Sequence, residues 1–253
     1  MPVYDSDRIT LYQDDCRNVL PIFPAEMFDM VVTDPPYLVS DSGRWGSGHE
    51  IIEGDSDPSW VLPVFEQIAR VLKPDSLCLT FYGWPHADIF FSAWKAVGLR
   101  PVSTLVFLKN RIAFGRFTRS QHELAYLLAK GSPAKPKNAV GDVLHWHQAK
   151  PQLHPHQKPL GAIGRIIGTY TDEDAVILDP FAGSGTTLLA ARRLGRAAGG
   201  VEIDEGHCDT ASLRLAQNML PYLPPLTPEQ LSLLDVIEPI LEEPPMTGSF
   251  FQI

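Results

Sequence analysis

The tetrad DPPY follows directly after the apolar run Phe28–Thr33 and has the chemistry to hold a flat amino group. Pro35 and Pro36 fix the backbone and lack N–H donors, so the turn is rigid and rich in acceptors. An exocyclic amino group donates two hydrogen bonds, and the Asp34 carboxylate and the Pro35 carbonyl can accept one each. Tyr37 can stack on the attached ring. With both hydrogens held, the nitrogen lone pair is localised for attack on a sulfonium methyl group.

A second loop, DPFAGSGTT from Asp179 to Thr187, follows the apolar residues 175–178. Its glycines let a ligand approach the backbone closely, and the helix expected next offers unpaired N–H groups. Glu202 lies at the end of the next expected strand, where a carboxylate can accept both hydroxyls of a ribose. The Lys-Ser/Thr pair of a phosphate-binding loop is missing, which disfavours a nucleoside triphosphate. The pattern predicts an adenosyl cofactor; the alternative is a plain tight turn.

Alternating strands and helices must position these two loops. Apolar patterns predict strands at residues 9–12, 28–33, 76–82, 102–108, 175–178 and 197–203, with another apolar run at 123–129. Helical periodicity predicts helices at residues 65–72, 85–97, 160–170, 186–194 and 205–218. The expected fold class is α/β, a doubly wound, mostly parallel sheet with helices on both faces. Because the carboxyl ends of parallel strands share one edge, the two loops should converge there.

The charge of the chain is segregated. The whole sequence of 253 residues carries a net charge of −9, yet residues 109–158 contain nine Lys or Arg and two acids, a local charge of +7. The rest of the chain therefore carries −16. Such an asymmetry favours a polyanion on one face of the protein. The alternative is a solvated basic loop without a partner.

Composition indicates an ordinary globular protein of the reducing cytoplasm. The hydrophobic fraction of 44% and the charged fraction of 20% are typical of soluble domains, and no apolar stretch reaches membrane-spanning length. The N-terminus does not read as a signal peptide. Cys16, Cys78 and Cys208 are odd in number and far apart, so neither a disulfide framework nor a CxxC metal pair is expected.

The two motifs resemble those of amino-methylating DNA methyltransferases, enzymes that use S-adenosylmethionine. DPPY resembles their catalytic motif and FAGSG their cofactor motif, and this order along the chain resembles the circularly permuted beta class. The segment Asp14-Asp15-Cys16 resembles the part that lines the adenine pocket of the cofactor. HPHQKP, at residues 154–159, resembles the element that contacts the methionine end. The resemblance covers residues 8–218 and implies a permuted, Rossmann-like methyltransferase fold.

The resemblance implies methylation of the adenine amino group in double-stranded DNA, with the target base flipped out of the helix. Catalytic roles are then expected for Asp34, Pro35, Pro36 and Tyr37. Cofactor contacts are expected from Asp15, Cys16, His156, Lys158, Asp179, Phe181, Ala182, Gly183, Ser184, Gly185, Thr186 and Glu202. DNA contacts are expected from Trp45 in the Gly/Ser-rich loop 38–57, and from Lys109, Arg111, Arg116 and Arg119.

The expected organisation is a methyltransferase domain at residues 1–218, with a basic target-recognition segment at about 109–155, followed by an acidic, proline-rich tail at 219–253. A homodimer is expected, because the resembled class is often dimeric and the tail is acidic and apolar.

Several alternatives stay open. DPPY favours adenine within the resembled family, but methylation of the cytosine amino group uses the same chemistry. Methylation of RNA or of a protein glutamine usually goes with NPPY and the unpermuted order, and a non-catalytic DNA-binding module would not need both motifs. The two H-x-H pairs formed by His145, His147, His154 and His156 have no cysteine nearby, so no metal site is expected.

Overall fold

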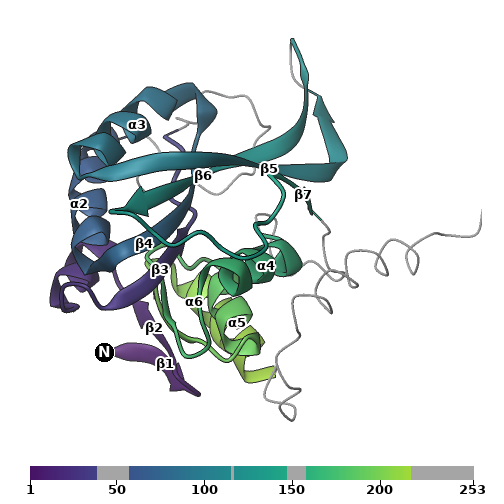
Figure 1. Cartoon of the computed structure of the whole chain (residues 1–253). Coiled ribbons are helices and arrows are strands. Elements are labelled where there is room, and N and C mark those ends of the chain that lie inside the picture. Colours follow the sequence, from purple (N-terminus) through teal and green to yellow (C-terminus); the bar gives the residue numbers. More distant parts are fainter. Residues whose placement is uncertain (39–56, 115–116, 147–157, 218–253) are drawn as a thin grey trace, which may run out of the picture.

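The computed structural model describes residues 1–38, 57–114, 117–146 and 158–217, with residues 111–114 described by their backbone only. This part of the chain forms a nine-stranded sheet in the order β1-β2-β9-β8-β3-β4-β6-β5-β7 (Figure 1). The strands are β1 (Pro2–Ser6), β2 (Ile9–Gln13), β3 (Phe28–Thr33), β4 (Leu72–Phe81), β5 (Leu99–Phe114), β6 (Arg119–Lys130), β7 (Val143–Trp146), β8 (Val176–Asp179) and β9 (Ala197–Glu202). The α-helices are α1 (Cys16–Val19), α2 (Val61–Val71), α3 (Ala87–Ala96), α4 (Leu160–Tyr170), α5 (Thr186–Arg193) and α6 (Glu205–Gln217). Short 3-10 turns lie at η1 (Leu20–Ile22), η2 (Pro58–Trp60) and η3 (Trp84–His86).

The central strands of the sheet run in one direction. β2, β9, β8, β3 and β4 are parallel neighbours, whereas β1 is antiparallel to β2, and β6 lies antiparallel between β4 and β5. β7 pairs in parallel with β5. The mostly parallel α/β sheet predicted from the sequence is therefore confirmed. Its carboxyl edge, where β2, β9, β8, β3 and β4 all end, also receives the amino end of the antiparallel β6.

Helices cover both faces of the sheet, and the strands supply apolar side chains to each face. In β4, Leu79 and Phe81 belong to the core cluster that includes α4, α5 and α6, whereas Cys78 belongs to the cluster of α1, α2 and α3. In β8, Ile177 and Leu178 divide in the same way. Each large side chain buried in this way contributes about 1.5–3 kcal/mol. Figure 1 shows the two helical layers on opposite sides of the sheet, as the sequence predicted.

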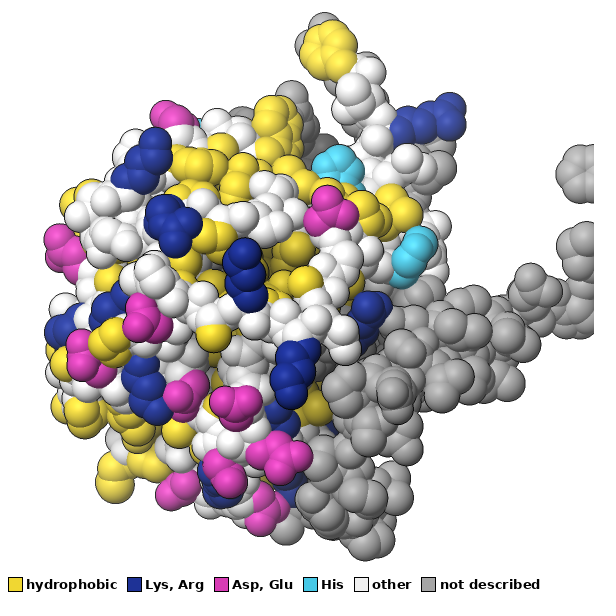
Figure 2. Space-filling model, in the orientation of Figure 1, with side chains coloured by type: hydrophobic (Ala, Val, Ile, Leu, Met, Phe, Trp, Pro, Cys, Tyr) yellow, Lys and Arg dark blue, Asp and Glu magenta, His cyan; other side chains and the backbone are white. Residues whose placement is uncertain are grey.

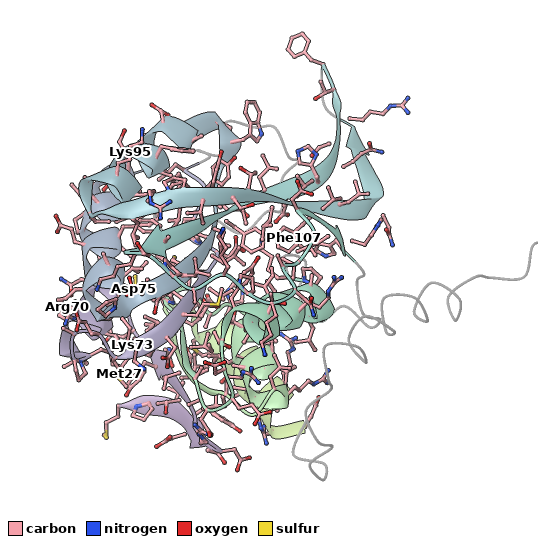
Figure 3. The ribbon with its side chains drawn as sticks, in the orientation of Figure 1. Met27, Arg70, Lys73, Asp75, Lys95 and Phe107 are labelled. Carbon is pink, nitrogen blue, oxygen red and sulfur yellow. The ribbon has the colours of Figure 1, made fainter. Side chains whose placement is uncertain are left out.

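Helix α2 shows how the surface layer is attached to the sheet. It buries an apolar stripe that includes Phe65 and Ile68, while the Arg70 guanidinium donates to the carbonyls of Leu20 (2.9 Å) and Phe23 (3.0 Å). In Figure 3 Arg70 lies at the outside of the molecule, whereas Phe107 of β5 points into the interior. Among the described helices, none is long and apolar enough to cross a membrane.

The structure differs from the sequence-based expectation in the region of β5, β6 and β7. These strands follow one another without an intervening helix, so strands and helices do not alternate throughout the chain. Residues 119–130 and 143–146, inside the expected recognition segment, form β6 and β7 of the main sheet. β4 begins at Leu72, directly after α2, four residues before the strand predicted at residues 76–82. The predicted tail 219–253 and nearly all of the loop 38–57 lie outside the described residues.

The β5–β6 hairpin extends beyond the carboxyl edge of the sheet (Figure 1). Pairing of β6 with β4 ends at Ala125, opposite Phe81, whereas pairing of β5 with β6 continues to Phe114 and Arg119. Phe117, between the two strands, is 86% exposed. Figure 2 shows a hydrophobic side chain at the tip of this projection. The hairpin therefore stands next to whatever binds at the carboxyl edge.

Candidate active site

The two loops singled out in the sequence meet at the carboxyl edge of the sheet, as predicted. β3 and β8 are parallel neighbours, with Met30 opposite Ile177 and Val31 opposite Leu178, so the turns that follow them start side by side. The next strand is β9, which ends at Glu202, and the N–H of Asp14 after β2 donates to the Glu202 carbonyl (3.0 Å). Four loops from distant parts of the chain are thus brought to one edge.

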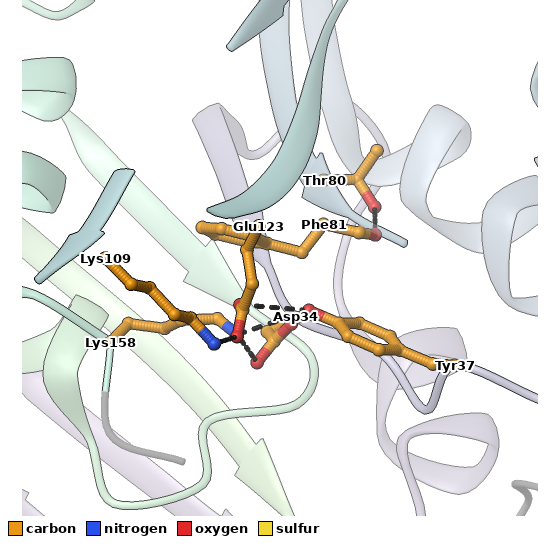
Figure 4. A network of polar contacts seen from close by, with 7 residues as sticks. All are labelled: Asp34, Tyr37, Thr80, Phe81, Lys109, Glu123 and Lys158. Atoms are coloured by element: carbon orange, nitrogen blue, oxygen red, sulfur yellow. Dashed lines mark hydrogen bonds and ion pairs between the residues drawn. The ribbon is translucent and has the colours of Figure 1, made fainter. Parts of the chain in front are cut away.

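Asp34 is held by two partners at the start of the DPPY turn. Its Oδ1 accepts a hydrogen bond from the Tyr37 hydroxyl (2.8 Å), and its Oδ2 forms an ion pair with Lys158 Nζ (2.6 Å; Figure 4). Burial raises the pKa of Asp34; the Lys158 ammonium opposes this shift, and the Glu123 carboxylate adds to it. Burial, followed by the charges of Asp34 and Glu123, raises the pKa of Tyr37 well above its usual value. Tyr37 is therefore a neutral donor.

Lys158 joins the DPPY turn to a second carboxylate, Glu123 on β6. Lys158 Nζ lies 2.8 Å from Glu123 Oε2, and Lys109 Nζ lies 2.5 Å from Glu123 Oε1. Burial alone would raise the pKa of Glu123, but the two ammonium groups outweigh it and lower the pKa to about 2. Likewise, burial would lower the pKa of Lys158, but Asp34 and Glu123 raise it. Glu123 and Lys158 are therefore oppositely charged at neutral pH.

Glu123 is a site residue that the sequence did not indicate. It opens the apolar run 123–129, and only its charge in that run distinguishes it. It reaches the site because β6 is antiparallel to β4, which places the amino end of β6 at the edge where β3 and β4 end. On β5, Phe107 pairs with Glu123, and Lys109 lies two residues further along.

A glycine and two aromatic rings shape the surroundings of this network. Gly83, just beyond β4, lies so close to the DPPY turn that a Cβ atom there would be 2.3 Å from the Tyr37 carbonyl oxygen. Any side chain at position 83 would displace Tyr37. The Lys158 ammonium lies 4.4 Å from the centre of the Phe81 ring and 5.4 Å from that of Trp146, in cation–π range.

The glycine-rich loop turns sharply toward Glu202. Gly183 (φ 50°) and Gly185 (φ 77°) adopt left-handed backbone conformations, which glycine takes without strain. Glu202 Oε2 accepts the N–H of Gly183 (2.7 Å), and Oε1 accepts the N–H of Asp204 (2.9 Å). A Cβ atom on Gly183 would meet no atom within 4 Å, so this part of the loop is open to an approaching group. Glu202 is thereby fixed with its carboxylate against the loop.

The remaining loop side chains face the protein. Arg214 of α6 donates to Ser184 Oγ (2.9 Å) and to Thr186 Oγ1 (3.2 Å), and both acceptor residues are buried. Ala182 is also buried, and the Phe181 ring packs edge-on against Trp60, with centroids 5.6 Å apart. The side chains of Ser184 and Thr186 are therefore engaged by α6, which leaves the backbone as the part of the loop that can contact a ligand.

Three further predicted cofactor residues lie at the same edge. Asp179 is buried and accepts the N–H of Phe181 (3.1 Å); burial raises its pKa well above the usual range. Asp15 accepts the N–H of Arg17 (2.8 Å) at the start of α1, and hydrogen bonding to Arg17 lowers its pKa despite partial burial. Cys16 is buried, and burial raises the pKa of its thiol to about 12, so it stays protonated.

The structure leaves several predicted positions undescribed. Trp45, Arg116, His147, His154 and His156 lie outside the described residues, as does the side chain of Arg111. Arg119 is exposed on β6, and Lys109 is paired with Glu123. In the described part of the chain, no three His, Cys, Asp or Glu side chains form a group that could hold a metal ion.

Comparison with known proteins identifies the family. The model of a DNA methylase family, N6_N4_Mtase, matches residues 28–213. Relatives include YubD of Escherichia coli (strain K12), described as a methylase, with 41% identity over 81% of this chain and 88% of that protein. The Type II methyltransferase M.ScaI of Streptomyces caespitosus is 52% identical over 85% of this chain and 83% of its own length.

Solved structures show the same fold. The PvuII DNA methyltransferase, described as cytosine-N4-specific, matches with a TM-score of 0.71 and 18% identity over 95% of each chain. M1.HpyAVI, solved as a complex with SAM, matches with a TM-score of 0.64 and 23% identity over 82% of this chain and 98% of that chain. The family match spans both loops at the carboxyl edge and the strands that carry them, and the chain therefore belongs to the N6/N4 DNA methylase family.

Proposed function

We propose that the protein transfers a methyl group from S-adenosylmethionine to the exocyclic amino group of adenine in duplex DNA. The observation that carries this proposal is the position of the DPPY turn directly beside the glycine-rich loop, on the neighbouring parallel strands β3 and β8. A cofactor bound over the loop after β8 would lie next to Asp34. The order of the two motifs along the chain assigns the protein, in this proposal, to the circularly permuted beta class.

The residues at the ends of β8 and β9 fit an adenosyl cofactor. Glu202 is oriented by two backbone N–H groups and keeps acceptor capacity for ribose hydroxyls. The open side of Gly183 admits close approach to the backbone. Asp15, on the neighbouring loop, would lie near the adenine end. When bound, S-adenosylmethionine supplies a sulfonium methyl group, whose C–S electron pair stays on sulfur as the new N–C bond forms.

Asp34 and the Pro35 carbonyl are assigned to the two hydrogens of the target amino group. They hold its lone pair toward the methyl group, which is catalysis by positioning and by preorganised electrostatics. The new N–C bond leaves a surplus proton on the nitrogen, which Asp34 accepts and passes to water. A buried carboxylate with a raised pKa suits this step, because it binds a proton more readily than an exposed one. Tyr37 is assigned to stack on the ring.

The target base must leave the duplex before this arrangement can form. Inside the double helix its amino group is paired and stacked, so no protein loop can reach both hydrogens. Base flipping costs about a few kcal/mol, and stacking on Tyr37 offsets part of that cost. The β5–β6 hairpin stands beyond the edge where the flipped base would enter.

Replacing Glu202 by Ala is expected to weaken cofactor binding about 10- to 100-fold, because two hydrogen bonds to a charged acceptor are removed. Isothermal titration calorimetry with S-adenosylmethionine measures the change. Glu205→Ala, which removes an exposed carboxylate three residues away, is the matched control and should bind as the wild type does. Unchanged affinity in a folded Glu202→Ala protein would contradict the assignment of Glu202.

The DNA-contacting surface is assigned to the basic segment 109–158, with Trp45 of the loop 38–57 near the target base. Replacing Arg111, Arg116 and Arg119 together by Ala should weaken DNA binding and make it less dependent on salt. The slope of log affinity against log salt should fall by about 0.9 for each phosphate that these arginines neutralise. Fluorescence anisotropy at several salt concentrations tests this, with Lys95→Ala, on the exposed face of α3, as control (Figure 3). A slope equal to that of the wild type would show that these arginines contact no phosphate.

The test of the proposed function is methyl transfer from labelled cofactor to duplex DNA, followed by digestion to nucleosides and mass spectrometry. N6-methyladenine supports the proposal. N4-methylcytosine supports the second candidate, methylation of the cytosine amino group. This candidate is kept because the structurally similar PvuII enzyme is described as cytosine-N4-specific. If the DNA carries no label after the reaction, both candidate functions are excluded. The homodimer and the cytoplasmic location stay predictions.

A further inference from the structure

Lys158 has one oxygen partner for each of its three ammonium hydrogens. Its Nζ lies 2.6 Å from Asp34 Oδ2, 2.8 Å from Glu123 Oε2 and 3.2 Å from the Tyr37 hydroxyl (Figure 4). Only 12% of the Lys158 side chain is exposed, against 28% for Asp34 and 21% for Glu123. The ammonium is thus shared between two carboxylates that are almost equally near to it.

This arrangement places one donor on each oxygen of Asp34, and each oxygen keeps a further lone pair. Tyr37 donates to Oδ1 and Lys158 to Oδ2, so the amino group of a base must share the carboxylate with a charged donor. An amino group is a weaker donor than an ammonium and competes poorly with it. A second acceptor for the ammonium therefore makes Asp34 a better acceptor for the substrate.

We propose that Glu123 is a positioning residue that acts through Lys158, as the acceptor that holds the Lys158 ammonium when Asp34 binds the target amino group. This inference rests on the proposed function. Glu123 does not touch the substrate. Its carboxylate draws the ammonium off Asp34 Oδ2 and so determines how much of that oxygen is available.

The geometry makes this transfer short and inexpensive. Lys158 is already within hydrogen-bond distance of both carboxylates, so only a small shift of the ammonium toward Glu123 is needed. Lys109 balances the second negative charge from the other side, at 2.5 Å from Glu123 Oε1. The charges of the two carboxylates and the two ammonium groups therefore cancel in either arrangement. The rings of Phe81 and Trp146 stay beside the ammonium in both.

The charge at position 123 also influences the protonation of Asp34. The charged or titratable groups around Asp34 are Lys158, Glu123, Tyr37, Lys109 (which acts through Glu123) and Asp179 on β8. Burial raises the pKa of Asp179 well above its usual value. Removing the negative charge of Glu123 leaves Lys158 on Asp34, and both changes lower the pKa of Asp34. Removing the positive charge of Lys109 strengthens the pull of Glu123 on Lys158, which raises the pKa of Asp34. A variant that removes the charge of Glu123 and one that removes the charge of Lys109 should therefore shift the pKa of Asp34 in opposite directions.

The experiment measures kcat and the pH dependence of kcat/KM for duplex DNA at saturating cofactor. Glu123→Gln is expected to lower kcat about tenfold. It should also shift the acid limb of the kcat/KM profile to lower pH by roughly one unit. Lys109→Met is expected to shift the same limb to higher pH. Glu123→Asp, which keeps the charge, should return the limb to its wild-type position. Affinity for S-adenosylmethionine, measured by calorimetry, should change less than twofold in all three variants.

A matched control is Glu66→Gln, an exposed carboxylate on α2, which should leave rate and pH profile unchanged. If the wild type methylates DNA and Glu123→Gln has wild-type kcat and an unmoved acid limb, the inference is overturned. A loss of activity together with a loss of cofactor binding, or shifts in the same direction for Glu123→Gln and Lys109→Met, also overturns it, because either indicates a structural role only. If the wild type transfers no methyl group to DNA, the proposed function itself fails first.

Discussion

Replacing Asp34 by Ala is expected to lower the rate of methyl transfer by about a thousandfold or more, while the protein should still bind S-adenosylmethionine. The expected loss is large because the Asp34 carboxyl group is the side-chain acceptor of the DPPY turn, and preorganised groups of this kind are typically worth about 10²–10³ in kcat. In the proposed mechanism, removal of the carboxylate also deprives the amino nitrogen of the group that takes up its proton. Single-turnover transfer of labelled methyl groups to duplex DNA, with cofactor affinity measured in parallel, tests the prediction.

The matched control is Asp174→Ala. The Asp174 carboxylate also forms an ion pair, with Arg8 at 2.6 Å, but 82% of its side chain is exposed. Asp174 precedes β8 and so lies at the opposite edge of the sheet. This variant should transfer methyl groups at the wild-type rate. An Asp34→Ala protein that kept more than a tenth of the wild-type rate would rule out the assigned role of Asp34.

Replacing Lys158 by Met destabilises the fold by about 3 kcal/mol at neutral pH, because it leaves two largely buried carboxylates facing each other without their shared cation. Met keeps much of the length of the side chain and removes the charge. The loss should depend on pH with a definite sign. The pKa of Glu123 is lowered from 4.5 to about 2 in the folded protein, so its pairing stabilises the fold above about pH 4.5 and ceases to do so as pH falls toward 2. The variant lacks most of this stabilisation.

Urea unfolding at several pH values measures this effect. The free energies of unfolding of wild type and Lys158→Met should differ most near neutral pH and converge as pH falls below about 4.5. Lys73→Met is the control, because Lys73 pairs with Asp29 (2.6 Å) with 41% and 30% of the two side chains exposed. Exposed pairs of this kind contribute about 0–1 kcal/mol. Equal losses in the two variants would show that burial of the Lys158 network contributes nothing.

The parts of the fold that could be predicted are those with continuous apolar patterns and clear ends. β3 was predicted at Phe28–Thr33 and α4 at Leu160–Tyr170, because each apolar pattern is bounded by a charged residue or a proline. β1 and β7 were not predicted. β7 is only four residues long, and β1 is a largely exposed strand at the edge of the sheet. Their pairing depends on hydrogen bonds to neighbouring strands, which leave little trace in local sequence.

The candidate site was predictable only where its residues follow strands within a motif. Asp34 and Gly183 were expected at one sheet edge because each motif follows a strand of a parallel sheet. Glu123 depends on the antiparallel pairing of β6 with β4, a long-range arrangement that no local pattern specifies. Lys158 was expected at the cofactor, and that role remains a prediction, yet the structure also pairs it with Asp34. Lys158 and Asp34 are 124 residues apart in the chain, and the spacing of residues in a sequence does not show which distant charges will pair.

The pairing of β3 with β8 has a consequence for synthesis of the chain. Val176 at the start of β8 donates to the Asp29 side chain of β3, 147 residues earlier. At about 5–20 residues per second on the ribosome, β3 therefore waits on the order of 10 seconds for its neighbour. During that time one edge of an apolar strand is open to wrong partners. The seam between β3 and β8 can close only after β8 has been made, and closing it is the event that brings the two loops together. A nascent chain that ends before β8 can neither complete its core nor carry both halves of the site.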